Sequence, residues 1–309
     1  MQTFGNAGSG NGRRVPGLRS LSMAGVAAVM LIGAAPAFAQ NSNCGLSDLK
    51  NMAASYIAAQ TAGEPTKIPM ADWMPLTEQG EDGSLSTGML SMPQKIDFSR
   101  SFYDTTTCAS FTEAIVTDPA HPYVIGARMQ FAGHNSPIAA DRVASVELVI
   151  TDKKDWLFNA KKTLMYSKAE NWGEIPVADR DTRQVILAAA NAYLDSFDNK
   201  SVQVPWGTPC ARLEGGLYSG KGAPGVATPE DTCNVGVPSG VKIVDRKYVV
   251  DESIGAVAVV STFGSNKLPD VHSFRIEKGK IRYVHTMTVC KTPNCGLTLS
   301  DDIKKRLED

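Results

Sequence analysis

Apolar residues recur every three to four positions in two segments of the chain, residues 46–59 and 181–197. This spacing gives a helix one apolar face, so each segment is predicted to be a helix that packs on other structure, with Asp181 as the N-cap of the second. A loop rich in Pro and Gly follows each helix. Runs of alternating or β-branched residues come next. In the second half they predict four strands, at residues 242–250, 256–263, 271–277 and 280–289.

The same order of elements occurs twice. Placing Tyr56 over Tyr193 aligns a proline in both copies and, nine positions later, Glu78 over Glu214. Further on, VIGARMQF resembles IGAVAVVSTF, the segment at 254–263, and both are patterns of buried strands. The chain is therefore predicted to be a tandem α+β protein, in which each unit is a helix wrapped by a curved antiparallel sheet.

The predicted domain boundaries follow from this repeat and from the composition of the N-terminus. Pro176 lies in the expected linker between the units. The predicted parts are a signal peptide (1–39), a first unit with a structural role (40–172), a second unit with a pocket (173–300) and a polar tail (301–309).

Residues 1–39 carry three arginines and no acidic residue, then a short run of small and apolar residues. Ala37-Phe38-Ala39 is an A-x-A cleavage signal before Gln40, which predicts a secretory signal peptide. The alternative, a membrane anchor, needs about 18 strongly apolar residues. Export by the general or the twin-arginine route stays open, as does the choice between periplasm and exterior.

Composition excludes several classes of protein. The 309 residues contain 31 Lys+Arg against 32 Asp+Glu, and 43% are hydrophobic, which is typical of a globular protein and not of a disordered one. A balanced charge offers no excess of cations for phosphate, so we expect no nucleic-acid partner, and no membrane association after cleavage.

The six cysteines all follow the cleavage site. An even number in an exported chain predicts three disulfides. Zinc is the competing interpretation, but no CxxC or paired Cys/His spacing supports it. Among the 15 possible pairings, the favoured one is Cys44 with Cys108, Cys210 with Cys233, and Cys290 with Cys295.

Two histidines are predicted to meet in the last hairpin. If Lys278-Gly279 is its two-residue turn, residues whose numbers add to 557 face each other. The expected pairs, all on the apolar face, are Ile276 with Ile281, Phe274 with Tyr283, and His272 with His285. The two imidazoles would then lie roughly 5 Å apart at Cβ. Such proximity resists double protonation and leaves one neutral ring as a base.

The first unit lacks these groups. With Asp152-Lys153 as the equivalent turn, the positions of the two histidines are expected to hold Val146 and Asn159, and Leu76 corresponds to Arg212. Any chemistry is therefore expected in the second unit. The opposing interpretation is that an inward histidine is a satisfied core residue.

Other polar and aromatic residues complete the predicted site. Asp270 could orient an imidazole, and Arg212 could stabilise a developing oxyanion, although a salt bridge from Arg212 to Glu214 is the alternative. Glu214, Tyr193, Trp206, Phe274 and Tyr283 are expected to contact the substrate, with packing as the alternative role for the aromatic residues.

The Tyr-bearing helix, the Val-Pro-Trp loop and the closing strands resemble the nuclear transport factor 2-like superfamily. VPWGTPCARLEGG and PDVHSFRIEKGKIRYVHTMTVC also resemble a largely uncharacterised family of exported fungal and proteobacterial proteins. The superfamily resemblance implies a cone-shaped α+β fold with a pocket between helix and sheet. Its members include dehydratases, isomerases, epoxide hydrolases and proteins that only bind.

Together these features predict an exported, cofactor-independent lyase or isomerase acting on a small hydroxylated, aromatic or cyclic molecule. We expect a monomer whose two units form an internal pseudo-dimer. A non-catalytic binding module is the alternative. A third interpretation places a metal on His272, His285 and a carboxylate.

Overall fold

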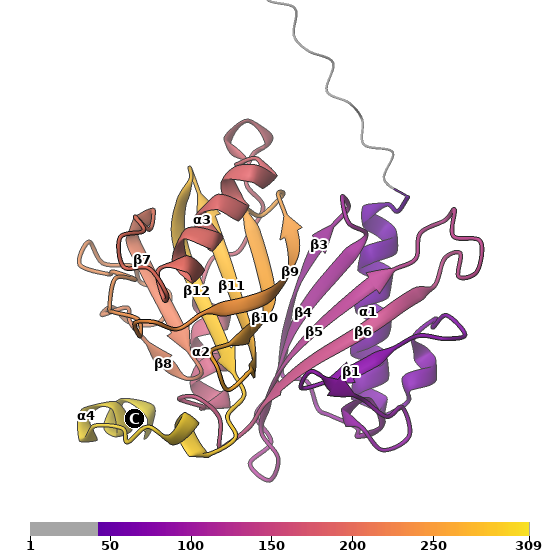
Figure 1. The fold of residues 1–309 in the computed structure, drawn as a ribbon, viewed down its shortest axis with the longest axis horizontal. Coiled ribbons are helices and arrows are strands. Elements are labelled where there is room, and N and C mark those ends of the chain that lie inside the picture. The colour runs from indigo at the N-terminus through magenta and orange to yellow at the C-terminus, as the bar shows by residue number, and fades with distance from the viewer. Residues whose placement is uncertain (1–42, 309) are drawn as a thin grey trace, which may run out of the picture. The chain divides into compact units, whose positions relative to one another are not determined.

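Each half of the chain folds as one long helix followed by six strands (Figure 1). The computed structural model describes residues 43–308, so the predicted signal peptide lies outside the described residues. The elements of the first half are α1 (Leu46–Ala62), β1 (Leu76–Glu78), β2 (Glu81–Asp82), β3 (Phe98–Asp104), β4 (Ala109–Val116), β5 (Tyr123–Phe131) and β6 (Val143–Thr151).

The second half repeats this order after an intervening helix, α2 (Ala160–Ala169). Its elements are α3 (Arg183–Asp195), β7 (Trp206–Glu214), β8 (Leu217–Tyr218), β9 (Ile243–Asp251), β10 (Ala256–Phe263), β11 (Leu268–Glu277) and β12 (Lys280–Thr288), and the chain ends in α4 (Asp301–Glu308). Four short 3₁₀ helices lie in the connections: Pro65–Lys67, Met89–Ser91, Val177–Asp179 and Pro293–Gly296.

The two sheets have the same topology. Their strand orders are β2-β1-β6-β5-β4-β3 and β8-β7-β12-β11-β10-β9. The pairs β1 with β6 and β7 with β12 are parallel, and the other pairs are antiparallel. The α+β tandem is confirmed, although each sheet is mixed and not wholly antiparallel as predicted. This plan is consistent with tandem nuclear transport factor 2-like units.

Matching strands by their place in the sheet corrects one predicted alignment. β5 is equivalent to β11 and β4 to β10, so VIGARMQF in β5 does not correspond to residues 254–263, most of which form β10. Both are central strands buried on two faces. Such strands have similar apolar sequences, so composition does not distinguish neighbours.

Local capping fixes where the helices begin. The Asp48 carboxylate accepts from the backbone N–H of Gly45, and α1 ends at Gly63, whose φ of 67° suits glycine. The N-cap of α3 is Thr182, whose hydroxyl accepts from Val185 N. The prediction of Asp181 is therefore wrong by one residue. Asp181 instead accepts from Gly279 N, which ties α3 to the turn of the last hairpin.

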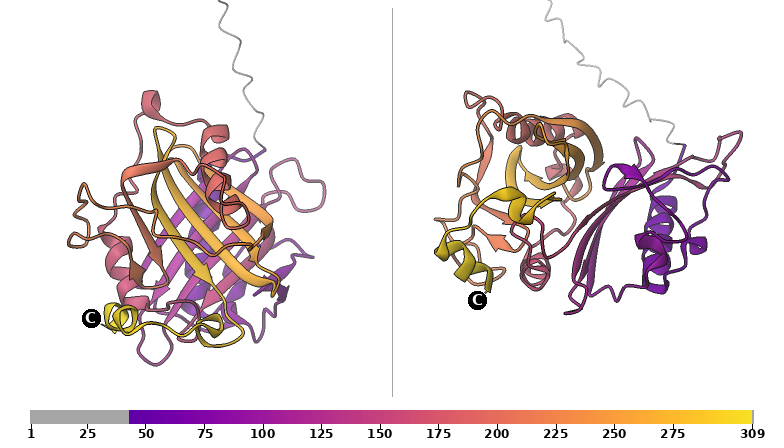
Figure 2. Two further views of the ribbon diagram at one scale, coloured as in Figure 1. Left: turned by 60° about the vertical axis from the view of Figure 1, so that its left-hand side comes forward. Right: turned by 60° about the horizontal axis from the view of Figure 1, so that its bottom comes forward.

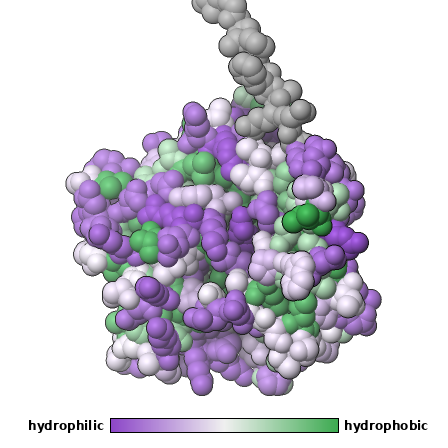
Figure 3. Space-filling view, turned by 45° about the vertical axis from the view of Figure 1, so that its right-hand side comes forward, coloured by the Kyte–Doolittle hydropathy of each residue, from purple (hydrophilic) through white to green (hydrophobic). Residues whose placement is uncertain are grey.

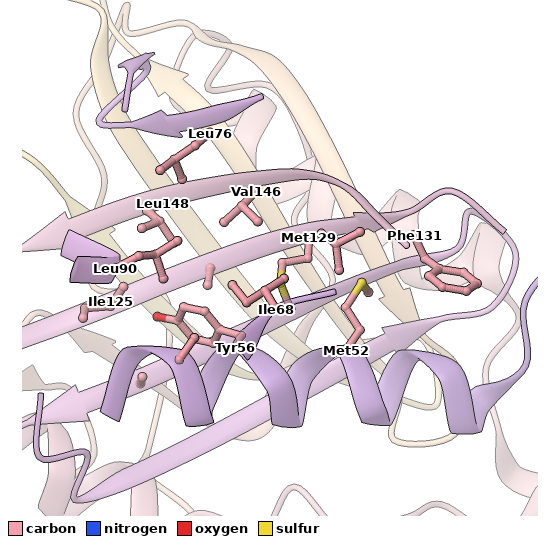
Figure 4. Packing of buried hydrophobic residues seen from close by; sticks show 14 of the residues in the cluster. Met52, Tyr56, Ile68, Leu76, Leu90, Ile125, Met129, Phe131, Val146 and Leu148 are labelled. Atoms are coloured by element: carbon pink, nitrogen blue, oxygen red, sulfur yellow. The ribbon is translucent and has the colours of Figure 1, made fainter. Parts of the chain in front are cut away.

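Side chains fill the space between α1 and the first sheet. Met52 and Tyr56 point from α1 toward Met129 and Leu148 of the sheet, with Ile68 between them (Figure 4). All five are at most 2% exposed. Burial of such side chains stabilises the fold by roughly 1.5–3 kcal/mol each. In the first unit, these side chains thus form a filled core between the helix and the sheet.

A second cluster joins the faces of the two sheets that are turned away from their helices. It includes Phe102 and Phe111 from the first sheet and Val249 and Ala258 from the second, with Trp172 between the units. Residues 43–308 belong to one compact unit. Figure 2 shows α1 along one face of the first sheet and α3 along one face of the second.

All three predicted disulfides are confirmed. Cys44 pairs with Cys108, Cys210 with Cys233 and Cys290 with Cys295. Along residues 43–308 no helix combines the length and the hydropathy needed to cross a bilayer. On the face shown in Figure 3, hydrophilic and hydrophobic residues are interspersed, as is usual for a protein surface in contact with water.

Candidate functional site

The last hairpin contains a β-bulge that changes the predicted register. The turn at Lys278-Gly279 is confirmed, with both residues at positive φ, and Ile276 faces Ile281. Beyond that pair the register shifts by one, because Arg282 is an extra residue on β12. From there on, facing residues have numbers that add to 558.

The shift separates the two histidines, so the predicted facing pair is wrong. His272 faces Thr286, and His285 faces Ser273. Because side chains alternate along a strand, His272 lies on the face that packs on α3, and His285 lies on the face toward the first sheet. The metal site that was considered on both imidazoles has no geometric basis.

Phe274 and Tyr283 are separated in the same way. Phe274 faces Val284 and packs against Tyr193, with ring centroids 5.3 Å apart. Tyr283 lies on the opposite face, stacked on Trp172 at 5.7 Å. The prediction that both rings share one face is therefore wrong.

The first-unit comparison also needs correction. Residues 155–159 form no strand, and Asn159 is the N-cap of α2, where it accepts from Lys162 N. Equivalence through sheet pairing instead uses Glu78 beside Leu148 and Glu214 beside Thr286. This equivalence retains the predicted match of Leu76 with Arg212.

The pairing shows that the second unit holds polar groups where the first is apolar. When the same equivalence is followed from β6 to β5 and from β12 to β11, Ala127 matches His272 and Ile125 matches Asp270. Leu148 and Ile150 match Thr286 and Thr288 in the same way. The apolar members belong to the core cluster on α1.

A cavity of about 460 Å³ lies between α3 and the second sheet. Tyr193 of α3 and Phe197, which lies just after the helix ends at Asp195, form one wall. The other lining residues come from the sheet and from loops: Trp156, Arg212, Glu214, Gly236, Val237, Pro238, Phe263, His272, Thr286, Thr288, Cys295 and Leu297. This is the position where the first unit has its filled core.

His272 and Asp270 form a buried dyad in this cavity wall. His272 Nδ1 lies 2.7 Å from Asp270 Oδ2, and both residues are at most 1% exposed. Ser261 and Thr288 also donate to the carboxylate, at 3.1 and 2.6 Å. Asp270 Oδ2 serves as the acceptor in this contact, so Nδ1 is assigned as the ring nitrogen that donates. Nε2 has no hydrogen-bond partner among residues 43–308 and is left as an acceptor at the cavity.

Three further polar atoms near the dyad are buried without a hydrogen-bond partner in the described chain: Tyr193 Oη, Thr286 Oγ1 and Arg212 Nε. Burial raises the pKa of the Tyr193 phenol, and the Arg212 guanidinium, 5.5 Å from the ring centroid, offsets this only in part. The phenol therefore stays protonated as a donor. Such groups are uncommon in native interiors, and because these three residues line the cavity, a ligand bound there can supply the missing partners.

Arg212 and Glu214 make the salt bridge that was the alternative prediction. Arg212 Nη2 donates to Glu214 Oε1, and Nη1 donates to the carbonyl of Gly236 at 2.8 Å. Glu214 also accepts from Trp156 Nε1 at 3.2 Å. Arg212 is 5% exposed, so this pair forms part of the cavity wall. Trp206 packs edge-on against Tyr193 at 5.6 Å behind that wall.

His285 belongs to a separate buried cluster between the sheets. Its Nδ1 lies 3.1 Å from Glu113 Oε2 of β4, and its Nε2 lies 2.6 Å from Glu170 Oε2. Burial lowers the pKa of this imidazole, but Glu170 and Glu113 outweigh burial and raise it to about 9. His285 is thus a cation at neutral pH. No local pattern predicts the two glutamates, because they lie 172 and 115 residues from His285 along the chain.

The second unit matches the sequence model of a domain of unknown function (DUF8021) over residues 179–288. The match begins just before α3 and ends at the last residue of β12, so it contains the helix and sheet that enclose the cavity. No curated protein matches the chain.

Proposed function

We propose that the protein is an exported enzyme of the lyase or isomerase type, with His272 as its general base. The observation that carries the proposal is the Asp270–His272 dyad, whose Nε2 is unpartnered at a cavity. A carboxylate on Nδ1 fixes the tautomer and stabilises the imidazolium that forms when Nε2 takes a proton. The A-x-A signal and the three disulfides support export to the periplasm or the exterior.

In this mechanism Nε2 removes a proton from a substrate carbon. The electron pair left behind forms a double bond and expels a neighbouring hydroxyl, which takes the proton back from His272 and leaves as water, or it shifts along the substrate until another carbon takes that proton back. Tyr193 Oη is a protonated donor in the cavity and stabilises the developing oxyanion, with Arg212 beside it. General base catalysis by one positioned group contributes about 10²–10⁴-fold.

The walls indicate the kind of substrate. A volume of about 460 Å³ suits a molecule of one or two rings. Most lining side chains are aromatic or aliphatic, and the polar ones are few and convergent, which suits a ring with a small number of hydroxyl groups. The helix and mixed sheet around the cavity support membership of the nuclear transport factor 2-like superfamily.

The test is proton exchange by mature protein in D₂O. A panel of small cyclic and phenolic alcohols and ketones is followed by NMR for deuterium incorporation, and by mass spectrometry for loss of water. We expect at least one compound to exchange or dehydrate, and His272→Gln to lose at least about 100-fold in rate. His121→Gln is the matched control, since this histidine is exposed.

Ligand affinity measured on the same variants separates catalysis from binding alone. We expect His272→Gln to keep affinity for the reactive compound while its turnover is lost. A compound that binds wild-type protein but never exchanges, or one that exchanges equally fast with His272→Gln, would contradict the enzyme and favour the binding module.

A further inference from the structure

A second, outer cavity of about 720 Å³ adjoins the first. The two share four lining residues, Trp156, Arg212, Glu214 and Gly236. The outer cavity is bounded by β8, by the loop after it and by α4, which lies next to β8 in Figure 1. The Arg212–Glu214 ion pair thus forms the boundary between an inner and an outer compartment.

The two compartments differ in charge. The inner one has a single ion pair and His272 among mainly apolar side chains. The outer one is lined by Lys221 and Arg306 in addition to the shared Arg212–Glu214 pair, which makes three cations and one carboxylate. This excess of positive charge favours an anion.

Both outer cations can bind a ligand. In the described chain the Lys221 ammonium makes no hydrogen bond or ion pair. Arg306 Nη2 donates to the carbonyl of Tyr218 at 2.7 Å, which holds the guanidinium over the cavity. Its Nη1 is 4.0 Å from the exposed Asp302, a distant pair that leaves donors free. At the boundary itself, the buried Arg212 Nε has no acceptor.

We propose that the substrate is an amphipathic anion: its ring system occupies the inner cavity beside His272, and a carboxylate or equivalent acidic group lies in the outer cavity near Lys221 and Arg306. This assignment rests on the proposed function for the role of His272. It explains why a mainly apolar site opens into a cationic compartment. It also gives the C-terminal segment a function, because α4 supplies Arg306 from beyond the matched domain.

The test uses two fluorescent probes with the same ring system. Anilinonaphthalene sulfonate carries an anionic group, and phenylnaphthylamine is its neutral counterpart. We expect the sulfonate to bind wild-type protein more tightly, with an affinity that falls as salt is added. The double variant Lys221→Met/Arg306→Met should weaken sulfonate binding about three- to tenfold and leave the neutral probe unchanged.

Two controls fix the location and the charge. Lys278→Met/Lys280→Met removes two exposed cations of the same unit that line neither cavity, and should change neither affinity. Val237→Trp fills the inner cavity and should abolish binding of both probes.

Equal affinities for the two probes, a loss shared by both probes in the Lys221→Met/Arg306→Met variant, or undiminished binding to Val237→Trp would overturn the assignment. Because the assay measures binding alone, these results are independent of turnover. The probe measurements can therefore contradict the anion site while the exchange assay still supports His272 as the base. Equally, the exchange assay can contradict His272 as the base while the probes support the anion site.

Discussion

The buried cluster of His285, Glu113 and Glu170 predicts a specific loss of stability at alkaline pH. In the folded protein the pKa of His285 is raised from 6.5 to about 9, with burial opposed and outweighed by the two carboxylates. A group whose pKa is raised by folding stabilises the protein fully below its unfolded pKa, and this contribution disappears as pH rises through the folded value. The sensitive window therefore runs from about pH 6.5 to above pH 9.

The magnitude follows from the two pKa values. Each unit of difference is worth about 1.4 kcal/mol, so the protonated imidazole contributes about 3 kcal/mol at slightly acidic pH. About half of this is lost by about pH 8, and nearly all of it by about pH 9.5. The Glu113 pKa shifts in the opposite sense: burial would raise it, but His285 leads the interactions that lower it. The contribution of Glu113 is thus lost toward acid, outside this window.

Urea unfolding of the oxidised protein, followed by tryptophan fluorescence at several pH values between about 6.5 and 9.5, measures this loss. We expect the free energy of unfolding of wild-type protein to fall by about 3 kcal/mol across this range. His285→Gln should be less stable at the start by about 3–5 kcal/mol, because two buried carboxylates lose their cation, and should show little of the pH dependence.

His134→Gln controls for a second acid-paired histidine, one that is exposed and should contribute little to the dependence. A wild-type stability that stays level between about pH 6.5 and 9.5, or a His285→Gln variant with the same slope as wild type, would refute the charged imidazole.

The remaining predictions concern the cavity and one disulfide. Asp270→Asn should reduce turnover about 100-fold or more while affinity for the ligand stays within a few fold, since the amide no longer fixes the base; unchanged rates of D₂O exchange would contradict this role. Tyr193→Phe should leave the free energy of unfolding within about 0.5 kcal/mol of wild type, because its hydroxyl has no partner to lose, but should slow exchange. Tyr56→Phe removes the equivalent hydroxyl of the first unit, which also has no hydrogen-bond partner, and should change neither the free energy of unfolding nor the exchange rate. Slower exchange in this variant would show that loss of the Tyr193 hydroxyl slows exchange only indirectly. Replacing Cys210 and Cys233 by Ser opens a loop with a sequence separation of 23 and should cost about 3 kcal/mol, measured by urea unfolding against the oxidised wild type; a cost below about 1 kcal/mol would contradict the loop-entropy estimate.

Elements with a local signal were predictable from sequence. The turn at Lys278-Gly279 has the short, flexible pair that a tight hairpin needs, and β10 spans the predicted residues. The repeated tyrosines lie at equivalent buried places on α1 and α3. The disulfide pairs were also predicted, because each joins cysteines within one half of the chain.

The errors have a physical cause in each case. Arg282 bulges without a glycine or proline to mark it, so the hairpin seemed regular. Glu113 and Glu170 reach His285 from segments that only the packing of the two sheets brings together.

The Asp270–His272 contact, by contrast, was predictable because residues two apart on one strand share a face.

The extra residue at Arg282 decides toward which face of the sheet every later side chain of β12 points. Removing Arg282 would restore regular alternation and keep every later residue opposite its present partner, because Arg282 is the residue without one. Removing a residue between Arg282 and His285 would turn that imidazole toward α3 and move Thr286 out of the cavity wall. The number of residues from the turn, as much as their identity, therefore decides which chemistry faces the ligand. A related chain without this bulge would need a gap at this position in an alignment before its histidines could be compared with His285.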